Sequence, residues 1–206
     1  MLDTILGNSG AIKRAQSLAA RMLHRGGISA DGATIAGAIL GVLAGVAFAV
    51  DAVAAGILLL GISAAFDALD GTLAREFGAP TPGGGLLDLC ADRLVEAAVI
   101  VGIVWSHPGL DFYALMLVAS WYLNITVFLA VGAALKNAGP KLIEYPPGIL
   151  ERTEALIFFA VLAMVETSRH LSWMGPILVL AMTALEIATG VQRFLFGRRM
   201  LASGGG

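Results

Sequence analysis

The chain has 206 residues, of which 58% are apolar and only 14% are charged. Soluble globular domains average about 45–50% apolar and about 25% charged residues, so this composition excludes an ordinary soluble domain and also a disordered one. The formal net charge of −2 provides no basic surface for nucleic acid, so we expect no nucleic-acid partner. The natural solvent for such a chain is a lipid bilayer.

The segment before the first apolar stretch is basic and amphipathic. Between residues 9 and 25, apolar side chains alternate at helical spacing with four basic ones, Lys13, Arg14, Arg21 and Arg25. This pattern predicts a helix lying on an anionic membrane surface, with an ordinary packing helix as the alternative. We therefore expect residues 1–28 to form a cytoplasmic juxtamembrane helix.

Six apolar stretches follow, each near the ~20 residues needed to cross a hydrocarbon core. Turn residues separate them, and they cover residues 32–50, 53–75, 84–105, 111–135, 153–168 and 174–195. The sequence thus predicts an all-α integral membrane protein with six transmembrane helices in one domain, residues 29–200. Residues 201–206 are expected to be a flexible tail or a cloning remnant. Gly37, Gly41 and Gly45 recur every four residues on the first stretch, which favours close helix contacts.

The basic residues predict the orientation. With six spans, one side of the membrane carries Lys13, Arg14, Arg21, Arg25, Arg75, Lys136, Lys141, Arg152, Arg193, Arg198 and Arg199, and the other carries Arg169. By the positive-inside rule, both termini face the cytoplasm. We expect a protein of the cell membrane.

Four aspartates lie within the second and third predicted spans: Asp67, Asp70, Asp88 and Asp92. The first two are spaced i, i+3 and the last two i, i+4, so each pair projects from one helix face. A loop over residues 76–83 joins the two spans as an antiparallel hairpin, which brings the two faces together. Glu96 continues the Asp88–Asp92 stripe by one turn, whereas Glu186, in the last span, has no partner recognisable from the sequence.

Charged aspartates inside a membrane are costly, at about +2.5–3.5 kcal/mol each near the centre of a span. A cation held between the helices offsets this cost, and a site made only of carboxylate oxygens favours Mg²⁺ or Mn²⁺. Four carboxylates balance two divalent ions, and a binuclear site can hold the oxygens of a phosphoryl group. The alternatives are that the aspartates pair with Arg75 and Arg93 or line a proton path.

The same region carries a longer pattern. Residues 67–92 read D-x₂-D-G-x₂-A-R-x₈-G-x₃-D-x₃-D. This resembles the signature of the CDP-alcohol phosphotransferase family at all eight positions and all gaps. The surrounding plan of an amphipathic helix and six spans is also similar, so the resemblance covers nearly the whole chain.

The resemblance implies transfer of a substituted phosphate from a CDP-linked donor, CDP-diacylglycerol as the first choice, to an alcohol hydroxyl with release of CMP. It implies that the four aspartates bind two divalent cations and that Asp92 is also the general base. It further implies a homodimer and a set of residues around the CDP group, Gly71, Ala74, Arg75, Asp31 and Thr34. For the last two, the matching segment has Ala30 where the family usually has proline.

The acceptor is less defined. Lys136, Arg152 and Arg193 fall on the cytoplasmic side, and a basic pocket there would suit an anionic alcohol. The segments around Arg152 and Arg193 resemble those of phosphatidylinositol-phosphate synthases, but two further basic positions of those enzymes are occupied here by Asn137-Ala138 and Ala155. Inositol phosphate or glycerol phosphate is therefore favoured, with serine and unphosphorylated polyols open.

An ion- or proton-coupled transporter is the alternative from another functional class. It predicts acids spread over several spans and an inverted repeat. Here the acids concentrate on one hairpin, and no repeat is apparent.

Overall fold

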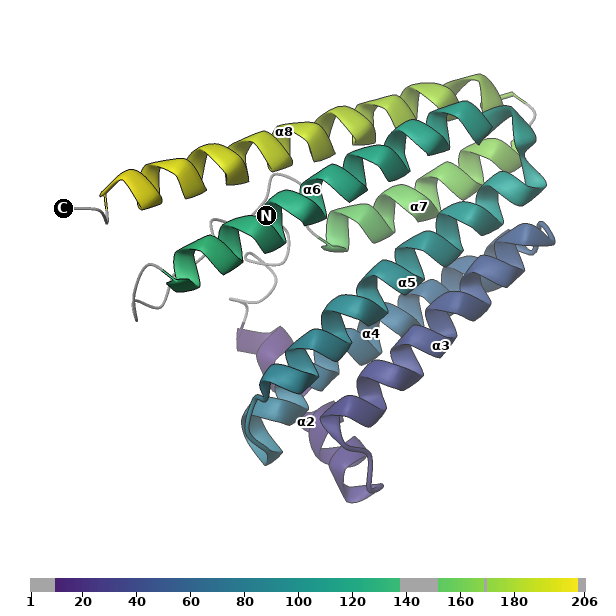
Figure 1. Cartoon of the computed structure of the whole chain (residues 1–206). Coiled ribbons are helices and arrows are strands. Elements are labelled where there is room, and N and C mark those ends of the chain that lie inside the picture. The colour runs from purple at the N-terminus through teal and green to yellow at the C-terminus, as the bar shows by residue number, and fades with distance from the viewer. Residues whose placement is uncertain (1–9, 138–151, 169, 204–206) are drawn as a thin grey trace.

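The computed structural model describes residues 10–137, 152–168 and 170–203, and its regular elements there are all helices (Figure 1). The seven long helices are α2 (Gly10–Arg25), α3 (Ala30–Ala49), α4 (Val53–Phe77), α5 (Pro82–Ser106), α6 (Asp111–Asn137), α7 (Arg152–Thr167) and α8 (Gly175–Ser203). Single 3₁₀ turns, Pro108–Leu110 and Ser172–Met174, precede α6 and α8. The predicted all-α fold is confirmed.

Consecutive long helices from α3 to α8 alternate in direction (Figure 1). α3 packs against α4 and α5, α6 packs against α8, and α7 contacts both groups. The ends of α4, α6 and α8 and the starts of α3, α5 and α7 therefore point towards the same end of the molecule, where α2 also lies. This is the end on which the aspartates and most basic residues were predicted to gather.

Four helical segments among the described residues are long and apolar enough to cross a membrane, namely Ala30–Ala49, Val53–Phe77, Pro108–Leu135 and Ser172–Ala202. The other two predicted spans are real helices of a different character. α5 carries Asp88, Asp92, Arg93 and Glu96. α7 has 16 residues, fewer than the ~20 that cross a hydrocarbon core.

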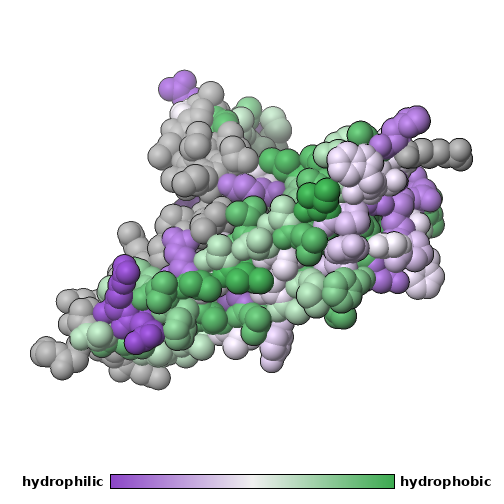
Figure 2. Space-filling model, turned by 90° about the horizontal axis from the view of Figure 1, so that it is seen from above, coloured by the Kyte–Doolittle hydropathy of each residue, from purple (hydrophilic) through white to green (hydrophobic). Residues whose placement is uncertain are grey.

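The outer surface of the bundle is apolar, as expected of a protein in lipid. Figure 2 shows apolar side chains over the middle of the visible face, with the most hydrophilic ones near its two ends. On α3 the large residues Ile35, Ile39 and Leu43 are exposed, while Gly41 and Gly45 are buried. Such an arrangement is the reverse of a soluble helix and matches a helix that faces lipid.

The glycines of α3 allow a close approach of neighbouring helices. A Cβ atom at Gly45 would overlap the carbonyl oxygen of Ala98, and one at Gly102 would overlap the carbonyl oxygen of Gly45. At Gly41 it would meet the side chain of Val95. The close packing predicted from the glycine spacing is found, and it is α5, the helix with Asp88 and Asp92, that α3 holds.

α2 is tied to the end of α4 by polar and aromatic contacts. The Ser17 hydroxyl donates to Oε2 of Glu76 at 3.0 Å, and Arg21 Nε lies 4.0 Å from the same oxygen. His24 stacks on Phe77 with ring centroids 4.4 Å apart. α2 thereby ends beside the aspartate-bearing end of α4.

α8 extends further than expected. It continues to Ser203, so residues 201–203 of the predicted tail are helical, and the assignment of residues 201–206 as a flexible tail or a cloning remnant stays a prediction. Leu201 and Ala202 favour helix, and the first glycine of the terminal run comes only at Gly204.

Candidate active site

Three of the four aspartates converge between α4 and α5. Asp67 and Asp70 lie one turn apart on α4, and Asp88 faces them from the first turns of α5. One carboxylate oxygen from each lies within 4.8 Å of the others. Asp70 is buried, and the other two are half-buried. The predicted meeting of the two helix faces is therefore found for these three residues.

Asp92 lies one turn further along α5 and outside this group of three. Its side chain is half-buried. The next residue, Arg93, pairs with Glu96, with 2.8 Å between Nη1 and Oε2. Asp92 thus stands between the three-carboxylate group and a second polar region of α5.

The start of α3 holds one of the carboxylates. The Thr34 hydroxyl donates to Oδ2 of Asp70 at 2.6 Å, and both side chains are buried. Ser29 caps α3 by accepting from the backbone N–H of Gly32 at 3.0 Å, which sets where the helix begins. This cap places Thr34 in the second turn of α3, opposite Asp70.

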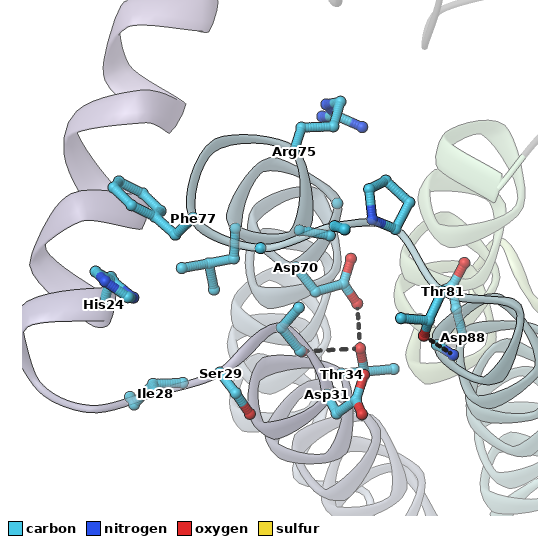
Figure 3. A pocket seen from close by; sticks show the side chains of 18 of the residues that line it. His24, Ile28, Ser29, Asp31, Thr34, Asp70, Arg75, Phe77, Thr81 and Asp88 are labelled. Atoms are coloured by element: carbon cyan, nitrogen blue, oxygen red, sulfur yellow. Dashed lines mark hydrogen bonds between the residues drawn. The ribbon is translucent and has the colours of Figure 1, made fainter.

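A pocket of about 570 Å³ opens between the start of α3, the end of α4 and the start of α5 (Figure 3). Its wall includes Asp70 and Asp88 of the carboxylate group. All five residues predicted to surround the CDP group also line it: Asp31, Thr34, Gly71, Ala74 and Arg75. In Figure 3, Arg75 lies above Asp70, and the stacked His24 and Phe77 lie to the left of it.

The small residue at position 71 leaves room for Arg75. A Cβ atom at Gly71 would lie 3.1 Å from Nη1 of Arg75, one turn along the same helix. Arg75 Nη2 donates to Thr72 Oγ1 at 3.3 Å. The guanidinium is exposed at the end of α4, where its planar donors can meet a phosphate.

The start of α5 completes the pocket. Thr81 caps this helix, its hydroxyl accepting from the N–H of Gly84 at 2.9 Å. A Cβ atom at Gly84 would lie 3.4 Å from Oδ1 of Asp31, so α3 and α5 approach closely here. Asp31 and Gly84, more than fifty residues apart in the chain, thus meet in one wall of the pocket.

Of the three predicted acceptor residues, the structure describes the side chain of Arg193. It lies on α8, where Nη1 donates to Oδ1 of Asn124 at 2.9 Å and the guanidinium stands 5.1 Å from the centre of the Phe128 ring. Lys136 is near the end of α6 and Arg152 begins α7, at the same end of the molecule. The side chains of these two lie outside the described residues.

Sequence analysis missed a buried polar cluster beside Arg193. Asn124 Nδ2 donates to Oε2 of Glu186 at 2.5 Å, and both residues line a second, smaller pocket of about 100 Å³ together with Arg93 and Arg193. The signal was present, because polar residues stood within the apolar runs of α6 and α8. Their pairing, across 62 positions of sequence, appears only in the packed structure.

The CDP-alcohol phosphatidyltransferase family model matches residues 28–192, most of the chain. The chain belongs to this family. The resemblance inferred from residues 67–92 is thereby confirmed, and with it the enzyme class: a CDP-alcohol phosphotransferase that depends on divalent cations. A transporter finds no support in these comparisons.

Similar proteins and similar solved structures agree with this family assignment. The phosphatidylinositol phosphate synthase of Mycobacterium tuberculosis is 30% identical over 194 residues, covering 89% of this chain and 85% of the relative. An archaetidylinositol phosphate synthase of Methanothermobacter thermautotrophicus is 29% identical, covering 82% and 83%. The crystal structure of the M. tuberculosis enzyme with CDP-DAG bound has a TM-score of 0.74 at 25% identity, covering 89% and 94% of the two chains. The structure of that enzyme with manganese and citrate has a TM-score of 0.70 at 25% identity, covering 93% and 90%.

Proposed function

We propose that this protein transfers a phosphatidyl group from CDP-diacylglycerol to a hydroxyl of a small phosphorylated polyol, inositol phosphate or glycerol phosphate, and releases CMP. The observation that supports the proposal is that the three-carboxylate group and the larger pocket share two residues. Asp70 and Asp88 belong both to the three-carboxylate group and to the 570 Å³ pocket lined by Gly71, Ala74 and Arg75. A nucleotide bound in this pocket would place its pyrophosphate beside the carboxylates.

The carboxylates fit a divalent metal site. Their ligand atoms are all carboxylate oxygens, which suit hard cations such as Mg²⁺ and Mn²⁺, and the buried Asp70 is oriented by Thr34. We propose Asp67, Asp70, Asp88 and Asp92 as the ligands of two such ions. When bound, the ions neutralise the charge of the pyrophosphate and stabilise the departing phosphate of CMP.

The residues of the chain then divide the work of an in-line displacement. Arg75 and the small residues Gly71 and Ala74 hold the CDP moiety, and Asp31 and Thr34 border it from α3. Asp92 takes the proton of the acceptor hydroxyl while the oxygen of that hydroxyl bonds to the lipid-side phosphorus. The bond from this phosphorus to the bridging oxygen breaks, and CMP leaves with the electron pair. Positioning of the two substrates supplies much of the rate.

The acceptor assignment is supported by Arg193, which lines the small pocket together with Arg93, the neighbour of Asp92 in the chain. A guanidinium matches the planar geometry of phosphate oxygens. Lys136 and Arg152 are proposed to contribute further positive charge from the ends of α6 and α7. The curated relatives named phosphatidylinositol phosphate synthase support the same acceptor class.

We further propose that all six helices from α3 to α8 cross the cell membrane and that α2 lies on its cytoplasmic surface. The alternating helix directions and the basic residues at the α2 end support this orientation. A lipid donor could then enter the pocket sideways from the bilayer, while the acceptor arrives from water. The homodimer implied by the family resemblance stays a prediction.

The test is an acceptor panel. Purified protein in lipid nanodiscs receives CDP-diacylglycerol and Mn²⁺ with inositol phosphate, glycerol phosphate, serine or inositol, and CMP and lipid products are quantified by mass spectrometry. We expect CMP and an equal amount of a new phospholipid with a phosphorylated polyol. Product with serine or inositol alone would refute the acceptor class, and no CMP with any acceptor would refute the donor.

A further inference from the structure

We propose that Asn124 and Glu186 are positioning residues for the acceptor, acting through Arg193 rather than by touching the acceptor. This inference rests on the proposed function, because it takes Arg193 as the group that meets the phosphate of the acceptor. It adds a purpose for two polar residues of α6 and α8 that neither the nucleotide pocket nor the carboxylate group uses.

Two hydrogen bonds link the three side chains, and both run in the same donor-to-acceptor direction, from Arg193 through Asn124 to Glu186. Glu186 Oε2 accepts from Asn124 Nδ2 at 2.5 Å, and Asn124 Oδ1 accepts from Arg193 Nη1 at 2.9 Å. An ionised carboxylate only accepts and a guanidinium only donates, and the side-chain amide of Asn124 joins them because it has a donor at one end and an acceptor at the other. The amide is thereby fixed in one orientation, and its oxygen is presented to Arg193.

α6 holds the guanidinium from two positions on one face. Asn124 and Phe128 are spaced i, i+4, so they lie one above the other along the helix. The hydrogen bond from Arg193 to Asn124 fixes one edge of the guanidinium, and the Phe128 ring lies 5.1 Å from its carbon. Two contacts of different kinds restrict a side chain that otherwise has many rotamers.

Because the polar residues of the cluster are buried, each of them needs its hydrogen-bond partner. Asn124 is 8% exposed and Glu186 7% exposed, and the Trp121 indole also interacts with Glu186. A buried polar group that loses its partner keeps the full cost of leaving water, so each member depends on the others. The cluster is therefore expected to hold a single arrangement before any substrate arrives.

The polar cluster lies beside the part of α5 that carries the proposed catalytic residues. Its pocket is lined from α5 by Leu89 and Arg93, the residues that directly follow Asp88 and Asp92 in the chain. We infer that an acceptor with its phosphate on Arg193 extends from this pocket past Arg93 towards the neighbouring Asp92, the proposed base. Holding Arg193 in place therefore sets where the reacting hydroxyl of a bound acceptor lies relative to Asp92.

The test exploits the direction of the hydrogen bonds. Asn124→Leu removes both links, and Asn124→Asp sets a carboxylate against that of Glu186. Asn124→Asp combined with Glu186→Gln keeps the total charge and reverses one bond, because the amide introduced at 186 donates to the carboxylate introduced at 124. That carboxylate still accepts from Arg193. Thr183→Val is the matched control, since this buried α8 hydroxyl donates to the Val179 carbonyl of its own helix.

Affinity for inorganic phosphate, measured by calorimetry without turnover, is the first readout. We expect about ten-fold or greater weakening of phosphate binding in both single variants. Asn124→Leu loses a hydrogen bond to a charged group, and Asn124→Asp sets two buried carboxylates against each other, which disturbs the position of Arg193. The phosphate affinity of the double variant should recover to within about three-fold of the wild type, and that of Thr183→Val should equal the wild-type affinity. In turnover, the acceptor KM should follow the same order while the donor KM stays unchanged.

Three results would overturn the inference: a wild type without phosphate affinity, single variants that bind phosphate normally, or a double variant no better than Asn124→Asp. Should Asn124→Leu fail to fold, the comparison of Asn124→Asp with the double variant still decides. Because phosphate binding needs no donor, a wild type that binds phosphate but releases no CMP would contradict the proposed function alone.

Discussion

The hydroxyl of Thr34 donates to Oδ2 of Asp70 at 2.6 Å, which joins the start of α3 to the carboxylate group of α4. Both side chains are less than a tenth exposed, which limits the access of water to this bond. A carboxylate fixed in this way keeps its other lone pairs directed towards its remaining partners. The nucleotide pocket and the proposed metal site thus share a structural element, because Thr34 also lines the pocket.

Replacing this hydroxyl should weaken metal binding. Thr34→Val preserves shape and removes the donor to Asp70, and loss of such an outer partner typically costs about 10–100-fold in metal affinity or activity. Thr34→Ser, which keeps the hydroxyl, should stay near wild type. The measurement is the Mn²⁺ concentration that gives half-maximal CMP release. Equal values for Thr34→Val and wild type would show that the bond does not orient Asp70 for a metal.

Removing divalent ions should abolish the reaction. After exhaustive chelation we expect no CMP release, and added Mg²⁺ or Mn²⁺ should restore it because the donor set consists of carboxylate oxygens. Electron paramagnetic resonance of Mn²⁺ should report binding that Asp88→Asn weakens. Undiminished turnover in the chelated protein would contradict the metal site.

Crowding the nucleotide pocket should affect the donor selectively. A Cβ atom at Gly71 would lie 3.1 Å from Nη1 of Arg75, so Gly71→Ala adds a methyl group to the pocket wall and makes the guanidinium shift by a few tenths of an ångström. We expect the KM for CDP-diacylglycerol to rise several-fold and the acceptor KM to stay unchanged. Gly61→Ala, on the same helix with no atom within 4 Å of the new Cβ, is the control. A donor KM unaffected by Gly71→Ala would contradict the close approach of the donor to position 71.

The α3–α5 contact should be intolerant of added bulk. Gly45→Val would drive a side chain into the carbonyl oxygen of Ala98, and backbone cannot move aside as a flexible side chain does. Overpacking of this kind costs roughly 1–3 kcal/mol or more of stability. Thermal unfolding in detergent should show a clear loss for Gly45→Val and none for Gly61→Ala. Equal melting of the two variants would contradict the close approach.

The sequence predicts well those features that depend on residues close together in the chain. The aspartate spacing on residues 67–92 determines which residues share a helix face, and a short loop forces the two faces together. The glycine repeat on α3 predicts a close contact for a similar reason, since small side chains lower the distance at which helices meet. The structure supplies the partners, which are α4 at Gly37 and α5 at Gly41 and Gly45.

What sequence could not predict depends on packing between distant helices. Asn124, Glu186 and Arg193 come from α6 and α8, whose alignment is set by side chains along their whole length. Thr34 likewise gains its role through the register of α3 against α4. Pattern reasoning places each of these residues on a helix, but it gives no relative rotation or depth for two helices that are not joined by a short turn.

The most direct test of the central claim compares wild type with Asp92→Asn at saturating Mn²⁺, CDP-diacylglycerol and inositol phosphate or glycerol phosphate. CMP and phospholipid are quantified together, and donor affinity is measured separately by calorimetry. The wild type should form both products in equal amounts. Asp92→Asn should bind the donor and lose at least about 100-fold in CMP release, as expected on removal of a general base. A folded Asp92→Asn protein that releases CMP at the wild-type rate would contradict the account.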